Sequence, residues 1–356
     1  MIKSILFVLI CSQSLSQKVV PFVDFNQFFK TFENGFFKQL EFQPIRDFKA
    51  GDDFVAYTDT RGNLRIYDGV ERKDISNMLF TYQVSDHLMA YNIGPTLNLW
   101  DAGKLQTLTY NSKEYVVKDS IVVYEDTRYN SVNVYWRNKK TPIYNVTGDL
   151  YMPKAIGDNI VVYKDNGDFY KIFYKGEFYN IGVWIGDIQF SVGTDVLAYN
   201  DPITRTFTVF YKGKFFDAES LFMQKFKAGR GFVAYEDANG NLCRFTTSKE
   251  MVSDFSPRFW DVNDDVILWD ENARMHAYSK NGVHEVSNFI PKDYKIKNNV
   301  VAFRNIYGGV SALVDGKVHE ITNVNDAEYE IYGNTVLVKM FNYNYIVLSD
   351  GKKYTN

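Results

Sequence analysis

Five aspartates recur at equivalent positions along the chain, and their spacing makes them the first candidates for a binding surface. Each follows a short apolar segment that contains an aromatic residue, as in Val55-Ala56-Tyr57-Thr58-Asp59. If equivalent turns lie on one face, their carboxylates form an acidic surface that attracts cations or a basic partner. Alternatively, each carboxylate accepts backbone N–H bonds within its own turn. The candidates are Asp59, Asp126, Asp165, Asp201 and Asp237.

Two of these segments are rich in oxygen-bearing side chains, as calcium-binding loops are. Asp165-Asn166-Gly167-Asp168 and Asp237-Ala238-Asn239-Gly240-Asn241 resemble parts of such a loop. Both lack a glutamate at the spacing where a calcium loop supplies its bidentate ligand. We therefore expect turns rather than calcium sites, and we predict no metal and no cofactor, with calcium as the weaker alternative.

No motif of a known catalytic site occurs in the sequence. The G-x-S-x-G, P-loop and H-E-x-x-H patterns are all absent. The four histidines fall in separate repeats without the paired spacing of metal ligands: His87, His276, His284 and His319. The sequence therefore assigns no catalytic residue and favours a protein that is not an enzyme.

Three tryptophans depart from the repeating pattern and are candidate contacts for a partner: Trp136, Trp184 and Trp260. Aromatic side chains combine a large apolar area with a polar edge, which suits protein or sugar recognition. The longest interval of the pattern follows Tyr124, and its additional residues fall at 139–158. Irregular insertions on a regular scaffold are typical places for binding.

The element that must position these residues is a repeat of roughly 35 residues. Its signature is a small apolar pair followed by an aromatic residue. Intervals of 33 to 39 residues separate successive aromatic positions. Such a period is typical of stacked supersecondary units. The aromatic positions are Tyr57, Tyr91, Tyr124, Tyr163, Tyr199, Tyr235, Trp269 and Phe303.

Each repeat reads as four short antiparallel strands. In residues 45–76, turn signals at Gly51-Asp52-Asp53, Arg61-Gly62-Asn63 and Asp68-Gly69 separate segments rich in β-branched and aromatic residues. Four such strands form one blade of a β-propeller. Counting nine strong units and a partial first unit, we predict an all-β fold: a single β-propeller of about 8–10 four-stranded blades. We expect its ends to meet in one blade, and two smaller tandem propellers are the alternative.

The segments Val55 to Tyr67 and Val233 to Leu242 resemble the blade signature of TolB-type β-propellers, which are WD-repeat-like. The resemblance extends over most of the chain as a short degenerate motif. It implies a propeller fold and an exported binding scaffold. It carries over no catalytic residue, because propellers support many unrelated functions.

The first residues predict export. Lys3 precedes the apolar segment Ile5 to Ile10, and Ser14-Leu15-Ser16 has the small-x-small pattern of a cleavage site. We assign residues 1–16 to a signal peptide and residues 17–356 to the propeller, in the periplasm, at the cell surface or outside the cell. Signal removal leaves Cys243 as the only cysteine, which excludes an intrachain disulfide and a cysteine-based zinc site.

Charge and hydropathy narrow the class of partner. The formal net charge is -3, so no basic surplus attracts nucleic acid. Beyond the signal, no apolar stretch is long enough to form a transmembrane segment. We expect an exported, non-catalytic scaffold that binds a protein or a glycan. Two alternatives are a glycan hydrolase or lyase with a central-channel site, favoured by converging unlike polar residues, and a structural component of the cell envelope.

Overall fold

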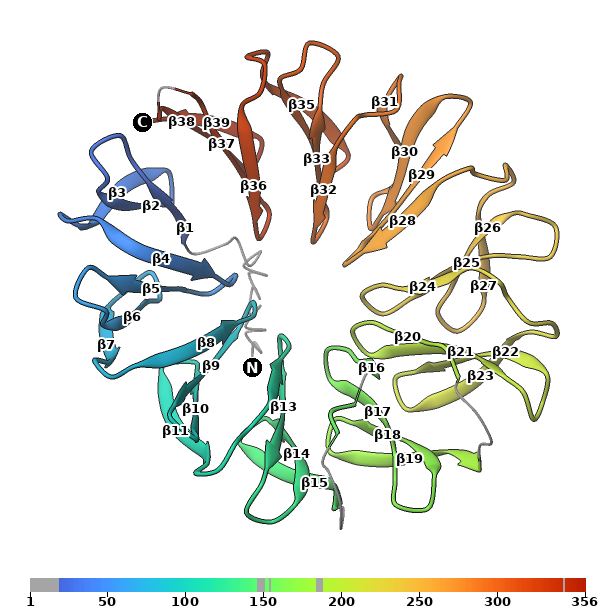
Figure 1. The fold of residues 1–356 in the computed structure, drawn as a ribbon. Coiled ribbons are helices and arrows are strands. Elements are labelled where there is room, and N and C mark those ends of the chain that lie inside the picture. Colours follow the sequence, from blue (N-terminus) through green and yellow to red (C-terminus); the bar gives the residue numbers. More distant parts are fainter. Residues whose placement is uncertain (1–18, 146–150, 154, 184–187, 342) are drawn as a thin grey trace, which may run out of the picture.

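A computed structural model describes residues 19–145, 151–153, 155–183, 188–341 and 343–356. Within these ranges every regular element is a β-strand and none is a helix. The described residues accordingly contain no helix that is long and apolar enough to cross a membrane. The strands form ten sheets in one ring (Figure 1). The prediction of a single β-propeller is therefore confirmed, with ten blades, and the tandem alternative is wrong.

Nine blades contain four antiparallel strands in sequence order, and the first strand of each is the one nearest the centre of the ring (Figure 1). We number the blades from 1 to 10 along the chain. Each first strand is short and only partly buried, because it borders the centre. The inner strands of blades 2 to 10 are β4 (Ile45–Ala50), β8 (Phe80–Val84), β12 (Tyr115–Val117), β16 (Ala155–Ile156), β20 (Phe190–Val192), β24 (Phe226–Ala228), β28 (Trp260–Asn263), β32 (Tyr294–Lys297) and β36 (Glu328–Tyr332).

The second strands carry the sequence repeat and are the most deeply buried. Neighbouring blades cover them on both faces, which explains why they are apolar without alternation. Tyr57 and Tyr235 are both fully buried. The second strands are β1 (Val20–Val23), β5 (Val55–Asp59), β9 (Leu88–Ile93), β13 (Ile121–Asp126), β17 (Ile160–Lys164), β21 (Val196–Asp201), β25 (Val233–Glu236), β29 (Val266–Glu271), β33 (Val300–Arg304) and β37 (Thr335–Lys339).

The third strands complete the apolar layers between blades. One core cluster, for example, joins Ile66 of blade 2 to Tyr91 and Trp100 of blade 3. The ring is therefore held by blade-to-blade packing. The third strands are β2 (Phe29–Glu33), β6 (Leu64–Tyr67), β10 (Thr96–Asp101), β14 (Ser131–Trp136), β18 (Phe169–Tyr174), β22 (Thr206–Tyr211), β26 (Leu242–Phe245), β30 (Arg274–Ser279), β34 (Val310–Val314) and β38 (Tyr345–Ser349).

The outer strands follow tight hairpins. In blade 6, Lys212 and Gly213 have φ of 47° and 85°, the left-handed values of a type I′ turn. The outer strands are mostly polar and exposed, which blunts the edge of each sheet. They are β3 (Phe36–Glu41), β7 (Arg72–Ser76), β11 (Lys104–Thr109), β15 (Lys139–Asn145), β19 (Glu177–Val183), β23 (Lys214–Glu219), β27 (Lys249–Ser253), β31 (Gly282–Ser287), β35 (Lys317–Thr322) and β39 (Lys352–Thr355).

Blade 1 corrects our prediction of how the ring closes. In the described chain it has three strands in the order β1-β2-β3, whereas β39 pairs with β38 in blade 10. The two ends therefore do not share a blade. The rings of Phe22 and Tyr345 lie 4.5 Å apart, and the Tyr345 hydroxyl donates to the carbonyl oxygen of Val23 at 2.6 Å. Side-chain packing, rather than a shared sheet, closes the propeller.

Candidate functional site

The five strand-end aspartates accept hydrogen bonds within their own turns. Oδ1 of Asp59 accepts the backbone N–H groups of Arg61 and Asn63, both at 2.9 Å. Oδ1 of Asp237 accepts those of Asn239 and Asn241 at 2.9 and 3.0 Å. Corresponding backbone bonds are made by Asp126, Asp165 and Asp201.

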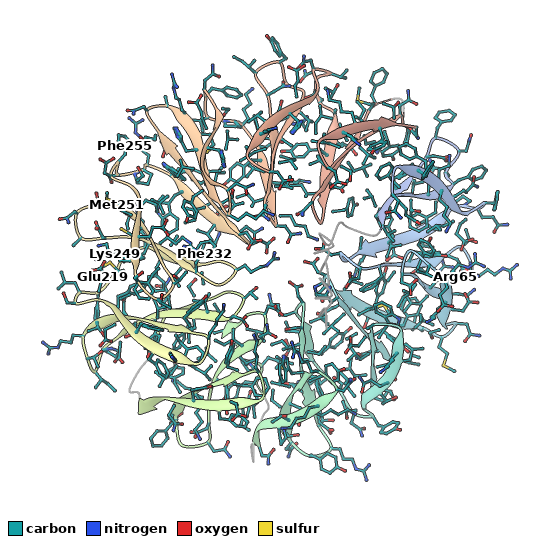
Figure 2. All side chains as sticks on the ribbon, turned by 180° about the vertical axis from the view of Figure 1, so that it is seen from behind. Arg65, Glu219, Phe232, Lys249, Met251 and Phe255 are labelled. Carbon is teal, nitrogen blue, oxygen red and sulfur yellow. The ribbon has the colours of Figure 1, made fainter. Side chains whose placement is uncertain are left out.

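Cations occupy the second oxygen of several of these carboxylates. Lys249 Nζ lies 2.9 Å from Asp237 Oδ2 and 2.7 Å from Glu219 (Figure 2). Burial would raise the pKa of Asp237, but the hydrogen bonds from Lys249 and from the turn hold it at about 2. Lys171 pairs with Asp165 in the same way, at 2.7 Å. Both segments that resemble calcium loops thus use their carboxylates internally, and no cluster of potential metal ligands occurs among the described residues.

The tryptophan candidates lie partly within the packed layers. Trp136 is half-buried, and its Nε1 donates to Asn159 Oδ1 at 3.0 Å. Trp260 is also half-buried and packs against the core cluster that contains Trp269. Trp184 lies outside the described residues, as do 146–150 and 154 of the long insertion. Neither described tryptophan projects freely from the ring.

A different set of acids meets at the centre of the ring. The turns between first and second strands bring them together, at the end of each blade opposite the strand-end aspartates. They line a cavity of about 450 Å³, which we call the channel mouth. Its carboxylates belong to Asp52, Asp53, Asp86, Asp119, Asp158 and Asp265.

Two cations connect different blades at this cavity, and one of them, Lys297, links blades that are distant in sequence. Lys297 of blade 9 places Nζ 2.8 Å from Asp52 of blade 2 and 2.8 Å from Asp86 of blade 3. Arg230 of blade 7 lies 2.9 Å from Asp265 of blade 8 and donates to Asn298 Oδ1 at 2.7 Å. A single ammonium group between two carboxylates is thus an arrangement that the channel mouth already contains.

Burial and neighbouring charges shift the pKa values of several side chains in the channel mouth. Burial, followed by the charges of Asp119 and Asp52, raises the pKa of Asp86 to about 6, although Lys297 opposes the change. Burial also raises the pKa of Asp158. The hydrogen bond to Asp53 raises the pKa of His87 to about 9, so its imidazole is positively charged at neutral pH.

Even with that charge, negative groups outnumber positive ones. The six carboxylates face four cations, if His87 is counted with Lys297 and the lining residues Arg230 and Lys280. Carboxylates in excess favour a cationic ligand, because its charge would relieve their mutual repulsion.

The sequence shows these acids four or five residues before the repeat aromatic, as Asp53 and Asp52 stand before Tyr57. That position is typical of turn formers. From the sequence alone, we predict the acidic surface at the strand-end aspartates and not at these turns. The signal that identifies the channel acids is their position before the second strand, since that turn is the one nearest the centre.

Comparison with protein families identifies the fold. Residues 13–354 match the model of the 10-bladed β-propeller domain. The chain belongs to this family. The match supports the propeller part of the sequence resemblance and not its finer TolB-type assignment. No curated protein sequence matches the chain.

Solved structures that match the chain share little sequence identity with it. A eukaryotic initiation factor shares 11% identity, with 85% of this chain and 95% of that chain covered and a TM-score of 0.45. BamB from Moraxella catarrhalis shares 13% identity over 76% and 92% of the two chains, with a TM-score of 0.32. The designed protein Ika8 shares 15% identity over 77% and 94%, with a TM-score of 0.33. These likenesses carry no argument about function.

Proposed function

We propose that this ten-bladed propeller is an exported, non-catalytic scaffold that binds a cationic segment of a protein partner at the channel mouth. The observation that carries the proposal is the crowding of carboxylates there, expressed in the raised pKa of Asp86. Export rests on the signal-like residues 1–16 and on the resemblance of the repeats to TolB-type propellers. Both support a location in the periplasm, at the cell surface or outside the cell.

A lysine or arginine side chain fits the chemistry of this site. Lys297 shows how one ammonium group bridges Asp52 and Asp86. Asp119 and Asp158 each accept a backbone N–H, from Asp86 and Ser120 respectively, and neither forms an ion pair with another described residue. An incoming cation that approaches these two carboxylates would meet negative charge that is not neutralised by an ion pair within the described chain, although the charges of His87 and Arg230 act on Asp119.

Calorimetry with a short polylysine peptide tests the proposal on the mature chain, residues 17–356. We expect binding that weakens at least about tenfold between low and physiological salt, because the interaction is electrostatic. The double variant Asp119→Asn/Asp158→Asn should weaken it by about tenfold or more. The matched control, Asp126→Asn/Asp201→Asn, removes the same charge at the opposite ends of the blades and should leave affinity within about twofold.

Two results would contradict the proposal. One is binding that is indifferent to salt. The other is equal weakening by both double variants, which would show that net charge alone, and not the channel mouth, attracts the peptide.

One observation favours a second candidate, a glycan hydrolase or lyase acting at the channel. Unlike polar groups converge there, and Asp86, with a pKa of about 6, holds a proton over part of the range where a general acid works. Release of reducing ends or unsaturated products from envelope polysaccharides, abolished by Asp86→Asn, would establish this enzyme in place of the scaffold.

A further inference from the structure

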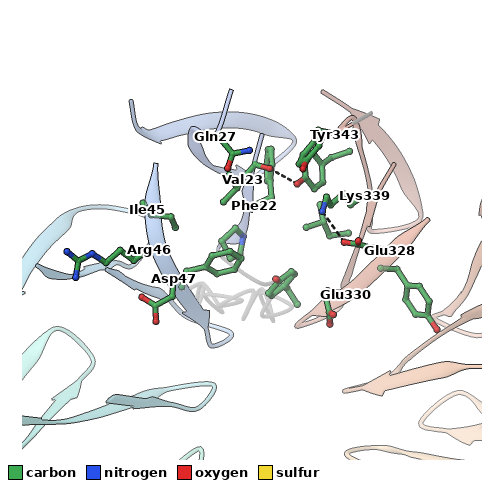
Figure 3. A pocket seen from close by; sticks show the side chains of 16 residues that line it. Phe22, Val23, Gln27, Ile45, Arg46, Asp47, Glu328, Glu330, Lys339 and Tyr343 are labelled. Atoms are coloured by element: carbon green, nitrogen blue, oxygen red, sulfur yellow. Dashed lines mark hydrogen bonds and ion pairs between the residues drawn. The ribbon is translucent and has the colours of Figure 1, made fainter. Parts of the chain in front are cut away.

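Blade 1 differs from the others on the side that faces the centre. In the part of the chain that the structure describes, β1 pairs with β2 only, and no strand lies on its other edge. A cavity of about 630 Å³ opens there, between β4 of blade 2 and β36 of blade 10. Figure 3 shows Phe22 and Val23 of β1 between Ile45 on one side and Lys339 on the other. We call this cavity the inner-strand position of blade 1.

The other blades show what such a position holds. In eight of them the inner strand carries an aromatic residue that pairs, across the sheet, with the central residue of the second strand. The aromatic residue stands nine positions before that central residue in the sequence. A small aliphatic residue follows two places after the aromatic, such as Val192 after Phe190. The aromatic residues are Phe48, Tyr82, Tyr115, Phe190, Phe226, Trp260, Tyr294 and Tyr329.

In blades 2, 6 and 7 this aromatic side chain completes a group of three aromatic rings. Phe226 packs on Phe207, 5.1 Å away on the third strand of the preceding blade, and Phe207 packs on Tyr235 at 5.2 Å. Blade 2 repeats the arrangement with Phe48 on Phe29 at 5.4 Å. The contact energy of such aromatic groups adds to the area that they bury.

At the inner-strand position of blade 1, two members of the group are in place. Phe22 occupies the second-strand place, because it pairs with Lys30 as Tyr57 pairs with Arg65. Tyr345 occupies the third-strand place in blade 10, and its ring lies 4.5 Å from Phe22. Both line the cavity.

Neither the described residues nor the chain left after the proposed signal cleavage supplies a third aromatic at this position. Counting nine places back from Phe22 reaches Gln13, in the segment that we assign to the signal peptide. Cleavage after Ser16 leaves only Gln17 and Lys18 before the first described residue. A mature chain of that length cannot provide both a turn and an inner strand.

We propose that the inner-strand position of blade 1 binds an extended segment of a protein partner with the pattern aromatic, any residue, small aliphatic. The segment adds a strand to the free edge of β1. Main-chain hydrogen bonds supply affinity, and the two side chains, at alternate positions on one face, supply specificity. The aromatic ring packs on Tyr345 and Phe22 as Phe48 packs beside Phe29 and Tyr57.

This inference rests on the proposed export, because only after signal removal is the chain too short to supply the strand itself. It does not depend on the channel mouth. The two can therefore fail separately: polylysine binding reports on the acids, and a strand peptide reports on blade 1.

A labelled peptide that copies residues 188–194, Ile-Gln-Phe-Ser-Val-Gly-Thr, tests the proposal by fluorescence anisotropy with residues 17–356. We expect saturable binding that changes less than about twofold with salt and does not compete with polylysine. The same peptide with Phe190→Ala should bind at least about tenfold more weakly, since the aromatic anchor is lost.

Matched protein variants locate the site. Tyr345→Leu should weaken the peptide about tenfold, whereas Phe207→Leu, the same change at a filled position, should leave its affinity within about twofold. A chain of residues 11–356 carrying Cys11→Ser, Gln13→Phe and Leu15→Val supplies its own strand. It should lose peptide binding and melt at a higher temperature than the mature chain.

Three results would overturn the proposal. The mature chain could fail to bind the peptide, or bind the alanine peptide equally well. Alternatively, mass spectrometry of the exported protein could show that residues 1–16 are retained, in which case the occupant is the chain's own N-terminal segment.

Discussion

Replacing Asp86 by asparagine should stabilise the protein at neutral and alkaline pH. The pKa of Asp86 is about 6 in the folded state, against an ordinary value of 3.8. Between these values the folded state binds more protons than the unfolded state, so stability falls as pH rises through the window. About two pKa units correspond to roughly 3 kcal/mol, reduced somewhat because the side chain is 17% exposed. We expect Asp86→Asn to gain about 1–3 kcal/mol near pH 8 and little near pH 4.

Asp237 provides a control of opposite sign. Its pKa is about 2, so the stability that its carboxylate contributes is present above the ordinary value and lost as pH falls towards 2. Asp237→Asn removes the pair with Lys249 and should cost about 2 kcal/mol near pH 8. Urea unfolding of both variants and the parent protein at several pH values measures the differences. A loss of stability in Asp86→Asn near pH 8, or a gain that does not change with pH, would refute the electrostatic account of the channel mouth.

Further predictions concern the core. Tyr235→Ala should destabilise by about 3–5 kcal/mol by chemical denaturation, because a fully buried ring is removed. Tyr235→Phe keeps the ring but removes the 2.9 Å hydrogen bond that the Tyr235 hydroxyl donates to Glu219, and it should cost about 1–2 kcal/mol. If Tyr235→Phe cost as much as Tyr235→Ala, the stabilisation would come from the hydrogen bond and not from the ring. Cys243 is fully buried, and burial raises the pKa of its thiol to about 11, so it should resist thiol reagents until the protein unfolds. Rapid labelling of the native protein would show that blade 7 opens. Cys243→Ala should still be exported and folded, and an obligatory intermolecular disulfide would contradict that expectation.

The fold could be predicted from sequence because a single physical requirement repeats. Each second strand lies between two blades, so each must be apolar on both faces with a large ring near its middle, as Tyr57 and Tyr235 are. The recurrence of that pattern sets the number of blades. The hairpin turns, such as Lys212-Gly213, could also be predicted from the sequence, because few residue types favour a left-handed backbone conformation.

The closure and the candidate site could not be predicted because they depend on relations between blades. Tyr345 and Val23 are far apart in sequence, and nothing local shows that they meet. Lys297 resembles any lysine at a strand end, yet it bridges Asp52 and Asp86 across the centre. A turn residue such as Asp86 looks the same in the sequence whether it faces solvent or the five other carboxylates of the channel mouth.

The pKa of Asp86 in the presence of a ligand tests the central claim most directly. Carboxyl ¹³C NMR of the mature chain, with aspartate selectively labelled and Asp86 assigned from Asp86→Asn, follows its titration with and without a short polylysine peptide. If a cationic segment binds at the channel mouth, its charge offsets that of Asp52 and Asp119, and the pKa of Asp86 should fall from about 6 towards its ordinary range. A pKa that is unchanged at saturating peptide would show that the ligand binds elsewhere.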